Sequence, residues 1–160
     1  MGSKLLIFDL DDTLFPRLPD NHTPEQLRSI KLFPQVREIL SQPGLKRVLV
    51  SKGDPLLQYE KLKALGIKDC FDLILISSTD QEKKSCFEQA LKTFPADNTF
   101  IIGDRINSEI MFGNELGLIT VLLRQGKYRD LVPANPWQIP HYIIHSYAEL
   151  EEIIGASCKQ

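Results

Sequence analysis

The chain has 160 residues, of which 42% are hydrophobic and 25% are charged. This length suits one domain with a single hydrophobic core and is too short for two full domains, so we predict one domain over residues 1–160. The 19 basic and 21 acidic side chains give a formal net charge of −2, which argues against a basic surface for nucleic acid. No apolar run approaches the ~18 residues of a membrane helix, and the N-terminus lacks the pattern of a secretory signal. We therefore expect a cytoplasmic protein with no membrane partner.

Neither the cysteines nor the histidines form a metal-ligand pattern. The cysteines are Cys70, Cys86 and Cys158. Their number is odd and none shares a C-x-x-C spacing, so we expect reduced, structural thiols. The histidines are His22, His141 and His145. They show no ligand spacing either, and we assign them to the surface or to packing.

Short apolar runs rich in β-branched residues alternate with stretches of helical periodicity. That alternation is typical of βα units around a parallel sheet, whose strands are apolar on both faces because helices cover both. The predicted strands are residues 4–9, 46–50, 71–76, 99–103 and 119–124, and the predicted helices are 34–40, 55–65, 82–94 and 107–116. A last strand and helix follow at 142–145 and 147–154. The sequence therefore predicts a three-layer, Rossmann-like α/β fold with a central parallel sheet flanked by helices.

Local signals indicate several helix ends and two long loops. Asp54 suits the N-cap of the second predicted helix and Gly66 its end, while Pro34 suits the first turn of the first helix. Residues 15–24 and 125–140 are irregular and rich in Pro and polar residues. Long loops of this kind inside a compact domain are often functional.

Acidic residues gather where the predicted strands end, which is where ligands bind in parallel α/β sheets. The first strand ends in Asp9, Asp11 and Asp12, three carboxylates within four residues. Acidic residues often serve as turn formers and caps, but carboxylates this crowded repel one another unless a cation or a proton relieves them. Asp104 follows the fourth strand, and Glu109 comes five residues later, placed to hold metal-bound water. Hard oxygen ligands of this kind suit Mg²⁺, so we predict a magnesium site here.

Two further strand ends carry residues able to bind an anion. Ser51 ends the second strand, although a serine there is more often a turn hydroxyl than a phosphate ligand. Lys83 and Lys84 open the predicted helix at 82–94, where the positive end of the helix dipole disfavours lysine unless an anion is near. We favour Lys83 because it shares a face with the apolar residues of that helix, and Lys84 stays open as the alternative.

The order of these motifs resembles the haloacid dehalogenase (HAD) superfamily of phosphotransferases, over essentially the whole chain. The stretch FDLDDTL at residues 8–14 is similar to the first motif, Ser51 to the second, Lys83 to the third, and Gly103-Asp104 with Glu109 to the fourth. The chain departs from the commonest pattern at Asp12, where Gly is frequent, and at Glu109, where Asp is frequent.

The resemblance implies a phosphatase that works through an aspartyl-phosphate intermediate. Asp9 would be the nucleophile, and Asp11 the general acid and then the general base. Mg²⁺ would bind the carboxylates of Asp9 and Asp104 and the backbone carbonyl of Asp11, while Ser51 and Lys83 would hold the transferred phosphoryl oxygens. The dehalogenases of the superfamily lack an Asp two residues after the nucleophile, so Asp11 favours hydrolysis of a phosphate monoester.

The spacing of the motifs leaves no room for a cap domain. Only 37 residues separate Thr13 from Ser51, and 31 separate Ser51 from Lys83, and core elements fill both intervals. We therefore expect a capless form with an open cleft, suited to bulky phosphorylated substrates, small or macromolecular, or closed by a second subunit. The basic residues Arg124, Lys127 and Arg129 could contact an anionic substrate, although a solvated loop is the commoner role for such residues.

Two other functions fit parts of the pattern. A receiver domain of two-component signalling also combines acids, a hydroxyl and a lysine on a parallel sheet, but its phospho-acceptor Asp ends the third strand. Here residues 76–79 read ISST, and the next acid is Asp80. The other alternative is a catalytically quiet HAD-like binding or regulatory module that keeps the metal site for structure. The presence of both Asp9 and Asp11 argues against it.

Overall fold

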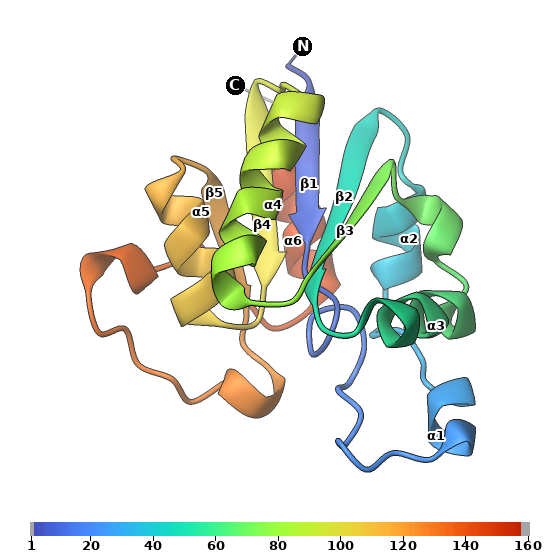
Figure 1. Ribbon diagram of the computed structural model, residues 1–160. Coiled ribbons are helices and arrows are strands. Elements are labelled where there is room, and N and C mark those ends of the chain that lie inside the picture. The colour runs from blue at the N-terminus through green and yellow to red at the C-terminus, as the bar shows by residue number, and fades with distance from the viewer. Residues whose placement is uncertain (1, 158–160) are drawn as a thin grey trace.

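The computed structural model describes residues 2–157, which form a six-stranded parallel sheet with helices on both faces (Figure 1). The strands are β1 (Lys4–Phe8), β2 (Leu45–Lys52), β3 (Leu73–Ser77), β4 (Asn98–Gly103), β5 (Ile119–Leu123) and β6 (Tyr142–Ile144). The helices are α1 (Pro24–Arg28), α2 (Val36–Ser41), α3 (Pro55–Leu65), α4 (Asp80–Thr93), α5 (Met111–Glu115) and α6 (Tyr147–Ser157). The predicted Rossmann-like α/β class is confirmed. Cys158 lies outside the described residues, and Cys70 and Cys86 are free thiols.

The strand order is β3-β2-β1-β4-β5-β6, the doubly wound arrangement. The chain builds outward from β1 through β2 and β3, and then crosses back to place β4 on the other side of β1. The winding direction therefore reverses between β1 and β4, and the strand ends on either side of that reversal form the crevice in which such folds bind ligands.

Alternate residues of β1 supply the two apolar cores that hold the sheet between its helices. Leu6 and Phe8 face a core shared with α2, α3 and α6, whereas Leu5 and Ile7 face a core shared with α4 and α5. In Figure 1, α4 lies in front of the sheet and α6 behind it. A strand buried on both faces must be apolar at every position, which is why the run KLLIF has no alternation.

Several element boundaries differ from the sequence predictions. The helix predicted at 34–40 begins only at Val36, because Gln35 adopts a left-handed conformation (φ 69°) and leaves Pro34 in the preceding turn. The helix predicted at 82–94 starts earlier, at Asp80, where the side chain of Thr79 caps it. The helix predicted at 107–116 is interrupted: a wide turn at Ile106–Ile110 precedes a short α5.

Helix α1 was not predicted, although its signal is present in the sequence. The side chain of Thr23 accepts a hydrogen bond from the Gln26 amide, and the Gln26 side chain accepts one from the Thr23 amide. With Pro24 at the first helical position this is a complete capping box. In contrast, α3 was predicted with the correct bounds, its Asp54 cap and its Gly66 end, since those signals flank a longer apolar repeat.

No helix among residues 2–157 combines the length and apolarity needed to cross a bilayer.

One buried hydrogen bond ties α6 to the segment after β1. The hydroxyl of Tyr147 donates to the backbone carbonyl of Thr13, and both residues are fully buried. We predict that Tyr147→Phe, which leaves that carbonyl without this donor, lowers stability by about 1–3 kcal/mol and the thermal midpoint by roughly 3–8 °C. Thermal unfolding followed by circular dichroism measures the effect. The matched control is Tyr142→Phe on exposed β6, and an equal change in both variants would contradict the prediction.

Candidate active site

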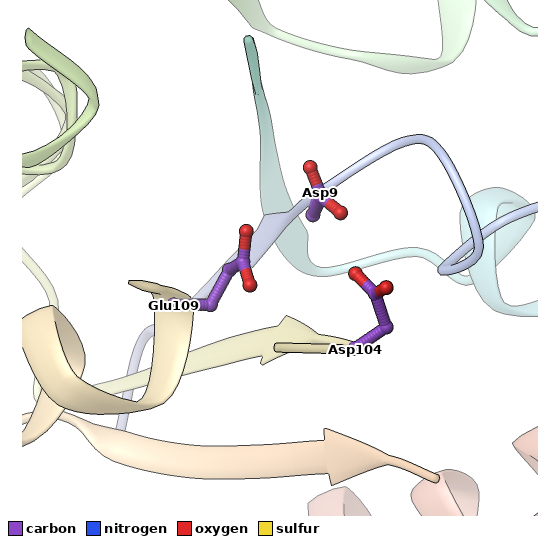
Figure 2. Close-up of side chains that lie close together, drawn as sticks. All are labelled: Asp9, Asp104 and Glu109. Carbon is purple, nitrogen blue, oxygen red and sulfur yellow. The ribbon is translucent and has the colours of Figure 1, made fainter. Parts of the chain in front are cut away.

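The reversal in the sheet places two acidic residues side by side. Phe8 and Ile102 are paired across β1 and β4, and the amide of Asp9 extends the ladder by donating to the Ile102 carbonyl at 3.1 Å. Asp9 follows β1 at once, and Asp104 follows the last residue of β4. Because parallel neighbours end at the same edge, both carboxylates lie close together there (Figure 2).

Glu109 completes a group of three buried carboxylates. Asp9, Asp104 and Glu109 each offer one oxygen, and these oxygens all lie within 4.8 Å of one another. Glu109 belongs to the wide turn after β4, and its side chain passes directly over Gly103. A Cβ on Gly103 would overlap the Glu109 side chain, so this position requires glycine to admit the third carboxylate.

Lys83 supplies the positive charge for this group. Its Nζ donates to Asp9 Oδ1 at 2.8 Å and also to Glu109 Oε1. Burial alone would raise the pKa of Asp9, but the charge of Lys83 and the hydrogen bonds to the Asp9 carboxylate together outweigh it and hold that pKa below the ordinary value. Burial conversely disfavours the Lys83 cation, yet the charges of Asp9 and Glu109 raise its pKa above the usual range. The ion pair is therefore present throughout the neutral pH range.

Asp104 has no such counter-charge beside it. Burial, followed by the charges of Asp9 and Glu109, raises the pKa of Asp104 to about 10. Burial also raises the pKa of Glu109 and outweighs the opposing charge of Lys83. One oxygen of each residue, Asp104 Oδ2 and Glu109 Oε2, is buried without a hydrogen-bond partner among the described residues.

The hydroxyl of Thr13 lies between two of the carboxylates. Thr13 Oγ1 is 3.1 Å from Asp9 Oδ2 and 3.3 Å from Asp104 Oδ1.

Asp11 lies in the pocket but outside this group of three carboxylates, bound by two residues that the sequence analysis missed. Lys61 Nζ donates to Asp11 Oδ1 at 2.8 Å, and Gln58 Nε2 donates to Asp11 Oδ2 at 3.0 Å. The same amide donates to Ser51 Oγ at 2.6 Å, and Ser51 is fully buried. Gln58 and Lys61 are three residues apart, on one face of α3. The sequence signal that could have identified Gln58 and Lys61 is that both are polar residues on the buried face of α3.

Asp12 does not join the carboxylates either, so the expected crowding of three acids after the first strand is wrong. Asp12 is in the left-handed region (φ 60°), which turns its side chain toward the two loops. Its carboxylate accepts hydrogen bonds from the Arg17 amide at 2.9 Å, from Arg17 Nε at 3.1 Å and from the Lys127 amide at 3.1 Å. Glycine is favoured at a positive φ. Here an aspartate adopts that conformation, and its side chain links the loop that holds Arg17 to the loop that holds Lys127.

The structure also separates the two adjacent lysines. Lys83 is buried at the carboxylates, whereas Lys84 is part-exposed and pairs with Glu115 at 2.8 Å on the surface. The basic residues after β5 contact the loop itself: Arg124 Nη1 donates to the Arg129 carbonyl, and Lys127 Nζ lies 5.4 Å from the ring centroid of Tyr128. Tyr128 is the residue of that loop that lines the pocket, while Arg124, Lys127 and Arg129 do not.

A polar pocket of about 100 Å³ stands over the carboxylates. We call its buried lining residues the floor: Asp9, Asp11, Lys83, Asp104 and Glu109. We call its half-buried or exposed lining residues the rim: Arg17, Lys52, Asp80, Arg105 and Tyr128. A volume of a few water molecules admits one compact group of phosphate size.

Fold and pocket together define a doubly wound α/β protein with a buried acidic site at its switch point. A family model described as HAD-hydrolase-like matches residues 83–150. A glyceraldehyde 3-phosphate phosphatase of Methanopyrus kandleri is 30% identical over 81% of this chain and 59% of its own length. The enzyme of that name from Methanocaldococcus jannaschii is 33% identical over 85% of this chain and 56% of its own.

Solved structures share the fold. A haloacid dehalogenase-like family hydrolase of Streptococcus pneumoniae superposes with a TM-score of 0.71 at 18% identity, covering 94% of this chain and 97% of that one. The chain is therefore similar to HAD-like hydrolases in the family-model match and in sequence, and it shares their fold. It spans less than three-fifths of the length of the two phosphatases it matches.

The raised pKa of Asp104 predicts how metal-free protein responds to pH. The unfolded carboxyl titrates near 3.8 and the folded one near 10, so the folded state holds the extra proton between these values. Stability should therefore fall as pH rises from 5 to 9, by up to about 1.4 kcal/mol per pH unit for one proton. Asp104→Asn should flatten this slope and raise the thermal midpoint at pH 8.

Urea unfolding in EDTA at pH 5, 7 and 9 measures the slope. The matched control is Asp130→Asn, since the Asp130 side chain is 93% exposed and its loss should leave the slope unchanged. An Asp104→Asn variant with the slope of the unmodified protein would contradict the assignment.

Proposed function

We propose that this protein is a Mg²⁺-dependent phosphatase that hydrolyses a phosphate monoester through an aspartyl-phosphate. The observation that carries the proposal is the ion pair of Asp9 with Lys83 inside a buried group of three carboxylates. The two similar enzymes named above support it, since both are named as phosphatases.

The buried carboxylates fit a divalent cation. Two buried oxygens, on Asp104 and Glu109, lack partners, and Asp104 must take up a proton at neutral pH in the absence of another positive charge. Three hard oxygen donors within 4.8 Å suit Mg²⁺. The carboxylates of Asp9 and Asp104 and the backbone carbonyl of Asp11 would hold it, with Glu109 beside them. When bound, the cation would supply positive charge that screens an anionic nucleophile from an anionic phosphate.

Asp9 is the nucleophile of the proposed reaction. Its pKa is held low, so its carboxylate is ionised and ready to attack. Lys83 on Oδ1 and Thr13 near Oδ2 fix the carboxylate in one orientation. The attack forms a bond between a carboxylate oxygen and phosphorus and breaks the bond from phosphorus to the ester oxygen. Lys83 would also hold the transferred phosphoryl oxygens.

Asp11 handles the proton in both halves of the reaction. It takes up a proton from solvent as substrate binds, gives that proton to the departing ester oxygen, and then removes a proton from the water that hydrolyses the aspartyl-phosphate. Lys61 and Gln58 hold its two oxygens before substrate binds. Ser51 would bind a phosphoryl oxygen: Gln58 donates to its Oγ, and among the described residues its hydroxyl proton has no acceptor.

We propose that this domain acts without a cap. Between β1 and β2 the chain holds only the short helices α1 and α2, and between β2 and α4 only α3, a single short turn and β3. The substrate would then reach the pocket from an open cleft, as a small or macromolecular phosphate ester, or a second copy of the chain would close it.

The nucleophile has a direct test. Asp9→Asn should abolish Mg²⁺-dependent hydrolysis of p-nitrophenyl phosphate, by about 10³-fold or more, because an amide is not a nucleophile for phosphorus. Asp130→Asn, an exposed change of the same kind, should retain full activity. Mass spectrometry of acid-quenched protein should find phosphate on Asp9 in the unmodified chain alone. Turnover that survives in Asp9→Asn would refute the mechanism, and an inactive unmodified protein would favour the quiet binding module.

Lys61 offers a separate test of how Asp11 is positioned. Lys61→Met removes one of its two donors, and we expect kcat to fall about tenfold or more with KM changed less than threefold. Lys61→Arg, which restores a donor and a charge, should recover most of the loss. Lys63→Met is the matched control, because Lys63 is exposed on the same helix. Equal kcat in Lys61→Met and the control would show that Asp11 needs no such support.

A further inference from the structure

The rim of the pocket carries more positive than negative charge. Arg17, Lys52 and Arg105 line it together with one acid, Asp80. Asp80 is shared between two of the cations, with Arg105 at 2.8 Å and Lys52 at 3.3 Å. Arg17 pairs instead with Asp12, which lies behind the rim. One carboxylate thus faces three cations at the mouth of the pocket.

The rim cations are still available to a ligand. The side chains of Arg17 and Lys52 are 35% and 42% exposed. Arg105 is only 18% exposed, but its Nε is buried and has no hydrogen-bond partner among the described residues. A buried guanidinium donor without an acceptor is costly and is relieved by an incoming oxygen.

Tyr128 holds the two arginines in place. The Arg105 guanidinium carbon lies 5.2 Å from the centroid of the Tyr128 ring, and that of Arg17 lies 5.7 Å from it. Arginines fixed on an aromatic ring lose little freedom when they bind an anion, and their planar fork matches a carboxylate or a phosphate. The rim is therefore preorganised for a second anionic group.

The floor does not need these cations. Lys83 and the proposed Mg²⁺ serve the transferred phosphoryl group: two of the three N–H donors of Lys83 bind Asp9 and Glu109, and the third is left for a phosphoryl oxygen. The rim cations come from three other segments: the loop after β1, the end of β2 and the residue after Asp104. A phosphate ester held at the floor would extend its leaving group, rather than its transferred group, toward these cations.

We propose that Arg17, Lys52 and Arg105 form a subsite for a second anionic group, carboxylate or phosphate, carried by the leaving group of the substrate. The inference rests on the proposed phosphatase function and specifies its substrate class: small phosphate esters whose alcohol portion is itself anionic.

Matched substrates test this directly. 3-Phosphoglycerate and glycerol 3-phosphate differ only by a carboxylate in place of a hydroxymethyl group, and fructose 1,6-bisphosphate and fructose 6-phosphate differ by a second phosphate. We expect kcat/KM to be at least tenfold higher for the anionic member of one pair or both, and the pair with the larger ratio identifies the preferred anion. Ratios near one for both pairs would overturn the proposal while leaving the phosphatase function standing.

Variants of the rim residues test whether these residues cause the preference for anionic substrates. Arg105→Met and Arg17→Met should each raise KM for the anionic member about tenfold and leave KM for the neutral member within twofold. Arg124→Met is the matched control, since Arg124 does not line the pocket. Asp80→Asn removes the competing carboxylate, so it should act in the opposite direction and lower KM for the anionic member. A loss of structure alone would affect both members of a pair equally and would contradict the proposal.

Binding without turnover separates this inference from the proposed function. Calorimetry on the unmodified protein with Mg²⁺ should find 3-phosphonopropionate bound at least fivefold more tightly than 3-hydroxypropylphosphonate, and Arg105→Met should remove the difference. This contrast is expected even if hydrolysis is absent. Equal affinity for the two phosphonates would overturn the subsite.

Discussion

Mutual repulsion among buried carboxylates is the constraint on which the rest of the site depends. The doubly wound sheet brings Asp9 and Asp104 together at its switch point, and Glu109 is added from the following turn. The fold relieves the resulting charge only in part, with Lys83. Burial, together with the remaining charge of Asp9 and Glu109, raises the pKa of Asp104. Repulsion among carboxylates destabilises the folded protein when no cation is bound. A cation that relieves this repulsion gains that free energy on binding, so the affinity of such a site for the cation is higher.

Each aspartate of the first motif has its own cation. Asp9 pairs with Lys83 from α4, Asp11 with Lys61 from α3, and Asp12 with Arg17 from the loop. Although the three acids are neighbours in sequence, the chain leaves the strand and turns after Asp9, so that their side chains point to different neighbours. Three roles thus become compatible within four residues: the proposed nucleophile, the proposed proton carrier and a structural link.

The strands, their parallel orientation and the residues at their ends were predictable, because a buried strand is apolar throughout and ligand sites follow such strands. The partners of those residues were not. Gln58 and Lys61 have no signature in α3 other than polarity, and their role arises only when α3 packs against the turn after β1. The left-handed Gln35 that delays α2 is equally invisible, since it is set by packing rather than by residue type.

Asp12 connects the chemistry to the rim. The residue takes the left-handed conformation for which glycine is preferred, and the reason lies in its three hydrogen bonds to Arg17 and to the amide of Lys127. The loop after β5 can approach it because Gly126, also at positive φ, has no Cβ to collide with the Asp12 carboxylate. These bonds set where Arg17 and the adjacent Tyr128 lie, and so they shape the pocket mouth. Asp12 therefore contributes to the shape of the opening through which a substrate would reach the proposed reacting groups, although it is not one of them.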